Sequence, residues 1–194
     1  MPEVEVKFEI PEGSSLDDFT RACAAVGLDL GPPETVEVVD TYYDSPDLRL
    51  RAQGRALRLR VSGHRRILGW KSLTPADPDG ISTREEEEFE MPEGTPPSLD
   101  PDLKPKFVVR QNRTRWQVQT GDGLRAEASW DTVTWEAKVG ESADRVLELE
   151  LKDGNPEDFR KVALGLGETL GWPTATWSKY ERGLALAGLE LGPE

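Results

Sequence analysis

Residues 3–7 of the chain read Glu-Val-Glu-Val-Lys, a stretch in which valine and charge alternate with period two. Successive side chains of a strand point to opposite faces, so one face carries Glu3, Glu5 and Lys7, and the other carries the valines. Like charges two apart on one face repel mildly, and nothing in solvent requires that arrangement. The fold depends on whether this charged face meets bulk water or the inside of the molecule.

The composition fits a globular protein with a high charge content. Of the 194 residues, 36% are hydrophobic and 31% are charged, which suits one domain over residues 1–194. No run approaches the roughly 18 apolar residues that span a bilayer, and the first residues lack the basic and apolar regions of a signal peptide. Cys23 is the only cysteine, which excludes an internal disulfide. We therefore expect a cytoplasmic protein with no membrane partner.

The charge is strongly acidic on average but unevenly distributed. The formal net charge is −13, which argues against a nucleic-acid partner. Basic residues nevertheless concentrate in two segments, 49–71 and 104–115. An acidic chain with two concentrated basic segments favours a small anion held inside the protein over a basic outer patch.

Alternating hydrophobicity predicts a protein made mainly of strands, with three helices. One helix follows the cap at Ser15 and runs to about Gly27, the second runs from Asn155 to near Gly171, and the third begins near Ser178. The proline-rich segment 91–105 reads as a connection within one domain. The expected strands are 2–10, 35–44, 55–62, 65–73, 82–91, 106–119, 123–135 and 144–152.

Nearly every expected strand has one apolar face and one charged face. Leu57 and Leu59 oppose Arg58 and Arg60, for example. In an ordinary barrel or sandwich the apolar faces meet in the middle, and this is the first interpretation that the residues suggest. The charges, however, come in pairs of one sign on strand after strand, which tells against this interpretation and leaves the inverse arrangement as the alternative. In that arrangement the apolar faces point outward beneath the three amphipathic helices, and the charged faces line a central tunnel.

A tunnel of this kind must hold more than protein atoms, because unpaired buried charges cost several kcal/mol each. Arginine and lysine bind phosphate oxygens, and clustered carboxylates bind a hard divalent cation such as Mg²⁺ or Mn²⁺. The pattern therefore predicts water, metal ions and a highly charged ligand in the tunnel.

The order of the charged motifs resembles a known family. EVEVK is followed by DTYYDSPDLRL at 40–50, then by ALRLR, GWK, TREEEEFE, RTRW, EASWD, LELE and SKY. Together these motifs resemble the CYTH, or triphosphate tunnel metalloenzyme, superfamily, and residues 40–50 are similar to its thiamine triphosphatase-like branch. The resemblance implies an α+β fold: an eight-stranded antiparallel closed tunnel barrel with a charged interior, flanked by a few helices.

The same resemblance implies a role for individual residues, with Mg²⁺ or Mn²⁺ as cofactor. The implied catalytic residues are Glu3, Lys7, Lys71 and Glu148. The implied metal ligands are Glu3, Glu5, Glu86, Glu88, Asp131, Glu148 and Glu150, with the register of the Glu85–Glu88 run open by one residue. The implied substrate-binding residues are Lys7, Arg58, Arg60, Lys71, Arg84, Arg113, Arg115 and Lys179, and Glu127 is a further carry-over.

The expected function is metal-dependent hydrolysis of inorganic tripolyphosphate. Thiamine triphosphate is the second substrate, with Trp70 or Tyr43 as candidates for stacking on its ring, although parity places Trp70 on the outer face. A class IV-type adenylate cyclase and a non-catalytic polyphosphate-binding module are further alternatives. The expected partner is a small triphosphate, and the sequence leaves monomer and homodimer open. We expect His64 in a surface turn, Asp40, Asp44 and Asp47 as turn caps, and Glu85, Glu87 and Arg125 as solvated or rim charges.

Overall fold

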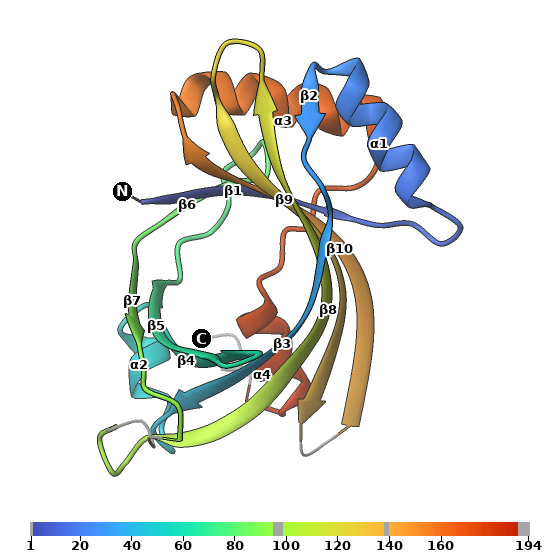
Figure 1. Ribbon diagram of the computed structural model, residues 1–194. Helices are drawn as coiled ribbons and strands as arrows, with labels where there is room; N and C mark the ends of the chain where they lie inside the picture. Colours follow the sequence, from blue (N-terminus) through green and yellow to red (C-terminus); the bar gives the residue numbers. More distant parts are fainter. Residues whose placement is uncertain (1, 95–98, 138–139, 190–194) are drawn as a thin grey trace.

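The computed structural model describes residues 2–94, 99–137 and 140–189, and Figure 1 shows its strands as a ring. The helices are α1 (Leu16–Ala25), α2 (Arg49–Ala52), α3 (Pro156–Leu170) and α4 (Lys179–Leu186). The strands are β1 (Glu3–Glu9), β2 (Leu28–Leu30), β3 (Glu34–Asp44), β4 (Arg55–Ser62), β5 (Arg65–Ser72), β6 (Ile81–Arg84), β7 (Glu86–Glu90), β8 (Lys104–Thr120), β9 (Arg125–Ala137) and β10 (Gly140–Asp153).

The sheet is antiparallel and follows the order β6-β1-β10-β9-β8-β3-β4-β5-β7, with β2 added on β8. Its two end members are separated in the chain by a single residue, Glu85. The backbone of Glu85 accepts a hydrogen bond from Ser72 at 2.9 Å, and its N–H donates to the Ser72 hydroxyl at 3.0 Å. Since β6 pairs with β1 and β7 pairs with β5, this interrupted strand closes the ring. Counted as one strand, β6 and β7 complete the predicted eight-stranded barrel.

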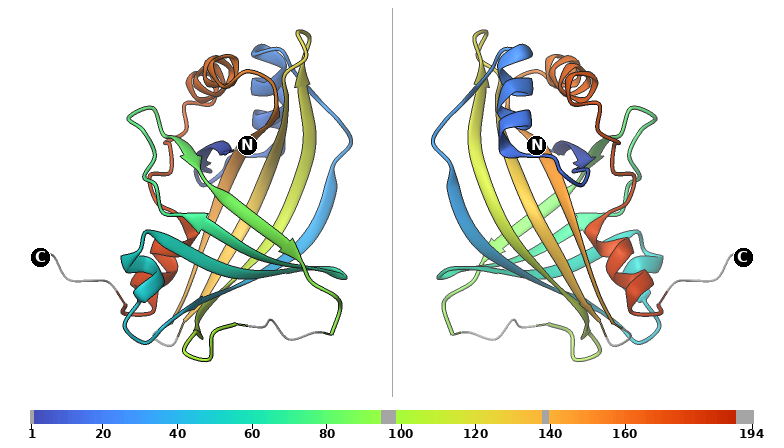
Figure 2. Two further views of the ribbon diagram at one scale, coloured as in Figure 1. Left: turned by 90° about the vertical axis from the view of Figure 1, so that its left-hand side faces the viewer. Right: turned by 90° about the vertical axis from the view of Figure 1, so that its right-hand side faces the viewer.

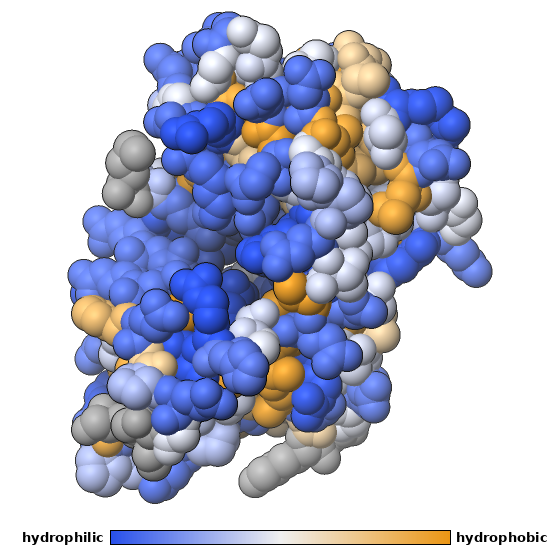
Figure 3. Space-filling model, in the orientation of Figure 1, coloured by the Kyte–Doolittle hydropathy of each residue, from blue (hydrophilic) through white to orange (hydrophobic). Residues whose placement is uncertain are grey.

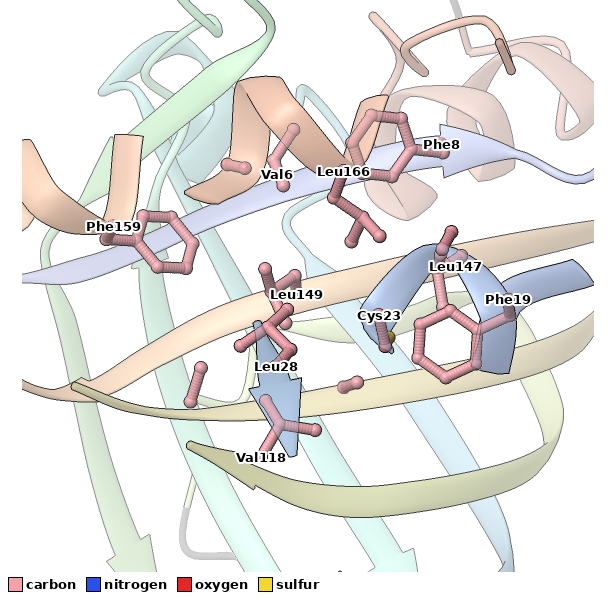
Figure 4. Close-up of a cluster of buried hydrophobic side chains, with 14 of the residues drawn as sticks. Val6, Phe8, Phe19, Cys23, Leu28, Val118, Leu147, Leu149, Phe159 and Leu166 are labelled. Carbon is pink, nitrogen blue, oxygen red and sulfur yellow. The ribbon is translucent and has the colours of Figure 1, made fainter. Parts of the chain in front are cut away.

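The apolar strand faces point outward, as the sequence predicts. Leu147 and Leu149 of β10 are fully buried, and they pack with Val6 and Val118 beneath α1 and α3 (Figures 2 and 4). Trp116 lies in the same cluster, with its ring centroid 5.4 Å from that of Phe19 in α1. Burial of each large side chain of this kind contributes about 1.5–3 kcal/mol, so the two helices stabilise the outer wall of the barrel.

Local signals at the helix ends agree with the sequence. Asp18 accepts a hydrogen bond from the Ser15 backbone at 2.8 Å, and Asn155 accepts one from the backbone of Glu157 at 2.8 Å. Helix α3 starts at Pro156 and ends at Leu170, and the next residue, Gly171, adopts the left-handed conformation with φ of 63°. Within the described ranges, no helix has the length and apolar character needed to cross a membrane.

The third predicted helix, α4, does not cover an outer face of the barrel, and the expectation that all three helices do so is wrong. It fills one end of the ring, where the side chains of Tyr180 and Leu184 meet apolar residues of the strands. Those strand residues share parity with the tunnel charges, since Phe107 and Val109 alternate in step with Arg113 on β8. The inward positions change from charged to apolar along the strand, so that end needs an apolar partner. The inward partners of α4 are Tyr42, Phe107, Val109, Val133, Trp135 and Val146.

Two further elements were not expected from the sequence. The short helix α2 follows Asp44, whose carboxylate accepts hydrogen bonds from the backbones of Leu50 (2.9 Å) and Arg51 (3.1 Å). Asp44 is therefore a cap, as predicted. The three-residue strand β2 adds to β8 opposite Val118–Thr120, outside the ring.

Candidate active site

A cavity of about 390 Å³ lies inside the ring and is lined by charged side chains of both signs. In the space-filling view the ring encloses a hollow whose visible rim is mostly hydrophilic (Figure 3). Every site residue predicted from the sequence lines this cavity except Asp131, which lies behind it. The structure therefore brings together side chains from the first strand, the last strand and the last helix. Those that line the cavity are Glu3, Glu5, Lys7, Arg58, Arg60, Lys71, Arg84, Glu86, Glu88, Arg113, Arg115, Glu148, Glu150 and Lys179, together with Glu127.

Carboxylates dominate the wall formed by β1, β10 and β9. Glu5 stands directly opposite Glu150 on the neighbouring strand, and Glu150 stands directly opposite Glu127 on the next one. Like charges in such cross-strand positions repel. Burial together with the charge of Glu3 raises the pKa of Glu150, and the ammonium of Lys152, 2.5 Å away, offsets this in part.

Basic side chains dominate the wall formed by β4, β5 and β8. Arg58 donates from Nη2 to Glu86 at 3.0 Å and to Glu88 at 3.1 Å. Glu86 and Glu88 therefore face the tunnel, which resolves the register that the sequence left open. Lys71 donates to both oxygens of Glu3 at 2.8 Å, joining this wall to the acidic one.

The deepest part of the site is a buried network around Asp131. Arg113 donates to its two oxygens at 2.8 and 2.6 Å, and Lys179 donates to Oδ2 at 2.9 Å. Burial opposes ionisation of Glu148, but Lys179, Lys7 and Arg113 together hold the pKa of this carboxyl well below its usual range. These three cations therefore favour the ionised form of Glu148.

One residue of the site was misassigned from the sequence. Asp40 was expected in a turn, but it lies within β3, is fully buried, and accepts two hydrogen bonds from Arg60 at 2.8 Å each. Asp40 is two residues from Tyr42, which lines the cavity, so the strand alternation indicates that Asp40 faces inward as well. Gln111 was missed as well, although it shares parity with Arg113 on β8.

The rim of the cavity includes Arg115, which donates to Glu34 at 2.8 Å. Neither Trp70 nor Tyr43 is among the described residues that line the cavity. Glu85 and Glu87 are exposed. His64 is exposed at the turn between β4 and β5, and Arg125 pairs with Asp153 outside the tunnel, as expected.

The carboxylates fit a hard divalent cation by their chemistry. Across the described residues, no three acidic, histidine or cysteine side chains stand close enough together to form a ready metal cluster. Each carboxylate instead holds a cation of the chain: Glu3 holds Lys71, and Glu5 holds Lys7 and Arg84. All of these donors are oxygens, and the opposed pair Glu5 and Glu150 would lose its repulsion on binding a cation. Glu3, Glu5, Glu148 and Glu150 are the residues that would hold it.

The fold and the tunnel together define the class of the protein. The CYTH domain model matches residues 1–169, and the chain belongs to the CYTH family. Its fold resembles a Hippeastrum protein proposed as an adenylyl cyclase and reported to have a dominant triphosphatase activity, with 19% identity, TM-score 0.64 and 98% of each chain covered.

Other solved structures share the same fold. The PH1819 protein of Pyrococcus horikoshii is 22% identical, with TM-score 0.61 and 94% of this chain and 98% of that chain covered. A proposed adenylate cyclase from Bacillus halodurans is 16% identical, with TM-score 0.60 and coverages of 93% and 96%. At these identities, the likeness concerns the fold.

Proposed function

We propose that the chain is a divalent-metal-dependent triphosphatase that hydrolyses inorganic tripolyphosphate inside the tunnel. The observation that carries the proposal is the convergence of both charge signs on one cavity of about 390 Å³. Basic side chains alone would serve binding, whereas the opposed carboxylates on β1, β9 and β10 have no role in holding an anion. The triphosphatase activity reported for the Hippeastrum protein supports the same reaction.

In this proposal, water adds to a terminal phosphorus, the P–O–P bond to the rest of the chain breaks, and orthophosphate and diphosphate leave. A bound Mg²⁺ or Mn²⁺ supplies charge neutralisation on the phosphate oxygens. Arg58, Arg60 and Arg113 grip the phosphate chain, and Lys7 and Lys71 neutralise the negative charge that grows on the leaving group. Glu148 stays ionised because its pKa is held low. Its carboxylate orients the attacking water. Positioning and electrostatics supply the rate enhancement.

The cavity lining favours tripolyphosphate over thiamine triphosphate. The two aromatic residues considered for stacking on a thiamine ring, Trp70 and Tyr43, are not part of the described lining. Tyr42 does line the cavity, but its ring stacks on Phe107 with centroids 4.9 Å apart and is mostly buried. Thiamine triphosphate is the second candidate substrate, and ATP conversion to cyclic AMP is the third reaction to test.

The test is a comparison of phosphate release from tripolyphosphate, thiamine triphosphate and ATP, with Mg²⁺, with Mn²⁺ and with EDTA. We expect the highest rate with tripolyphosphate and none in EDTA. Glu5→Gln should abolish the metal-dependent rate, whereas Glu136→Gln, an exposed acid paired with Arg110 outside the cavity, should leave it unchanged. Binding of tripolyphosphate without turnover would favour the binding module, and cyclic AMP formation would favour the cyclase.

A further inference from the structure

Asp40 of β3 is a fully buried acid next to the basic wall, and it lies behind the cavity rather than in its lining. It stands directly opposite Arg60 in the β3–β4 ladder. Arg60 donates from Nε to Oδ1 and from Nη2 to Oδ2, both at 2.8 Å, which is the two-bond fork that fixes a guanidinium plane. Arg58 Nη1 lies 3.7 Å from the same Oδ2. One carboxylate therefore holds the two neighbouring arginines of β4.

The same carboxylate is tied to the far side of the tunnel through Gln111. The Gln111 side chain donates to Asp40 Oδ2 at 2.9 Å, and its own oxygen accepts from Lys179 at 2.6 Å. The donor and acceptor ends of this amide are therefore both engaged, so it cannot turn over without losing both bonds. Asp40, Gln111 and Lys179 form a continuous chain from β3 to the start of α4.

Stability alone does not account for this arrangement. A buried ion pair is often no more stabilising than apolar residues of the same volume, because desolvation offsets the attraction. What the fork does provide is orientation. With Nε and Nη2 bound to Asp40, Arg60 is left to meet a ligand with Nη1, and Arg58 is held between Asp40 on one side and Glu86 on the other.

Resting on the proposed function, we infer that Asp40 is a positioning residue that presets Arg58 and Arg60 for the phosphate oxygens of a triphosphate. Its carboxylate touches no substrate atom and acts through the two guanidinium groups. Without it, both arginines keep their charge, but Arg60 loses the fork that fixes its plane and Arg58 loses the ion pair on one side. A misplacement of about 1 Å is enough to weaken a bound transition state by about 100-fold.

The experiment compares wild type with Asp40→Asn and uses Glu136→Gln as the matched control. Both variants lose one negative charge beside an arginine, but Glu136 is exposed and lies outside the cavity. Tripolyphosphate binding is measured by calorimetry in EDTA, where no turnover is expected, and KM and kcat are measured with Mg²⁺. We expect Asp40→Asn to weaken binding and raise KM by about 10- to 100-fold, with a smaller change in kcat, and Glu136→Gln to leave both constants unchanged.

A second readout does not depend on turnover. The arginine Nε–H resonance of Arg60 in a ¹⁵N-edited NMR spectrum should exchange slowly with water in wild type and rapidly in Asp40→Asn. If Asp40→Asn fails to fold, Arg60→Lys carries the same test, because lysine keeps the charge and cannot form the fork. Wild-type affinity in a folded Asp40→Asn or in Arg60→Lys overturns the inference alone. A wild type that binds no triphosphate overturns the proposed function, and the inference with it.

Discussion

The Nζ atom of Lys179 lies 2.9 Å from Oδ2 of Asp131 and 3.0 Å from Oε1 of Glu148, so the first residue of α4 delivers a cation to two buried acids of β9 and β10. Ser178 precedes it as the cap of the helix, where its hydroxyl accepts a hydrogen bond from the backbone N–H of Glu181 at 3.1 Å. The helix that fills one end of the barrel is thereby fixed to the charged chemistry of the tunnel.

Lys179→Met should both destabilise the protein and impair the proposed reaction. It leaves Glu148 without one of its cations in a buried site, and we expect the free energy of unfolding to fall by about 3 kcal/mol in denaturant titrations. Phosphate release should fall by about 100-fold. Lys161→Met removes an exposed lysine paired with Asp158 on α3 and should change stability by less than about 0.5 kcal/mol. Equal stability of the two variants would contradict the buried role of Lys179.

The contact between α4 and β8 leaves no room for a side chain at Gly183. A Cβ at this position would overlap the ring of Phe107, whereas a Cβ at Gly165 of α3 would meet Val26 at 3.5 Å, an ordinary contact. We expect Gly183→Ala to lower the free energy of unfolding by about 2–3 kcal/mol through overpacking. Gly165→Ala should instead stabilise α3 by up to about 1 kcal/mol, because alanine favours helix more than glycine does. Thermal unfolding of both variants measures the difference, and the opposite ranking would show that α4 does not pack as described.

The burial of Asp40 predicts how stability changes in acid. Burial raises the pKa of its carboxyl, but the charges of Arg60 and Arg58 outweigh it and hold the pKa well below the ordinary value. An acid whose folded pKa is depressed contributes stability that is present above its unfolded pKa of about 4 and is lost as pH falls toward the folded value. Below about pH 4, the free energy of unfolding should therefore fall less steeply with decreasing pH in Asp40→Asn than in wild type. The two slopes should differ by up to about 1.4 kcal/mol per pH unit. Chemical denaturation at pH 2 to 6 checks this, and parallel profiles would contradict it.

Cys23 should be chemically inert in the folded protein. It is fully buried in the cluster beneath α1 and α3, and burial raises the pKa of its thiol to about 12. The thiolate is the reactive form, so a thiol reagent at pH 8 should react only as fast as the outer cluster opens. Addition of denaturant should make the reaction immediate. Rapid labelling of the native protein would show that α1 does not seal this cluster.

The inside-out barrel could be predicted from the sequence because its charges alternate in step with single strands. Leu147 and Leu149 on one face and Glu148 and Glu150 on the other are a local pattern that fits either arrangement. The sign pairing on strand after strand raises the inverse arrangement, and the order of the charged motifs, which resembles the CYTH family, decides which face is inside. The break at Glu85 could not be predicted, because TREEEEFE reads as one uninterrupted alternation. The break is required because β6 pairs with β1 and β7 pairs with β5, and this pairing is visible only in the structure.

The position of α4 inside the ring and the burial of Asp40 were not predicted from the sequence pattern for a related physical reason. An amphipathic helix has the same pattern whether it covers a barrel or fills its end, and the difference lies in which strand residues it meets. On β8, the inward series runs from Phe107 through Val109 and Gln111 to Arg113. This change from apolar to charged along one face was visible in the sequence and marks the closed end. Aspartate is common in turns, which favours a turn for Asp40, but the alternation of its strand neighbours puts it on the inner face.

The position of β1 in the ring also has a consequence during synthesis. Its register joins Glu5 to Glu150 and Lys7 to Glu148, so this edge of the first strand must wait for the last strand of the barrel, whereas its other edge pairs with β6. Until β10 has left the ribosome, the cations and carboxylates that will face each other belong to an open, uneven sheet. Pairing over such a span is slow and leaves an unpaired edge in the meantime. The ring can therefore close only after β10 has been made, and a chaperone that shields the unpaired edge would have most to act on just before that moment.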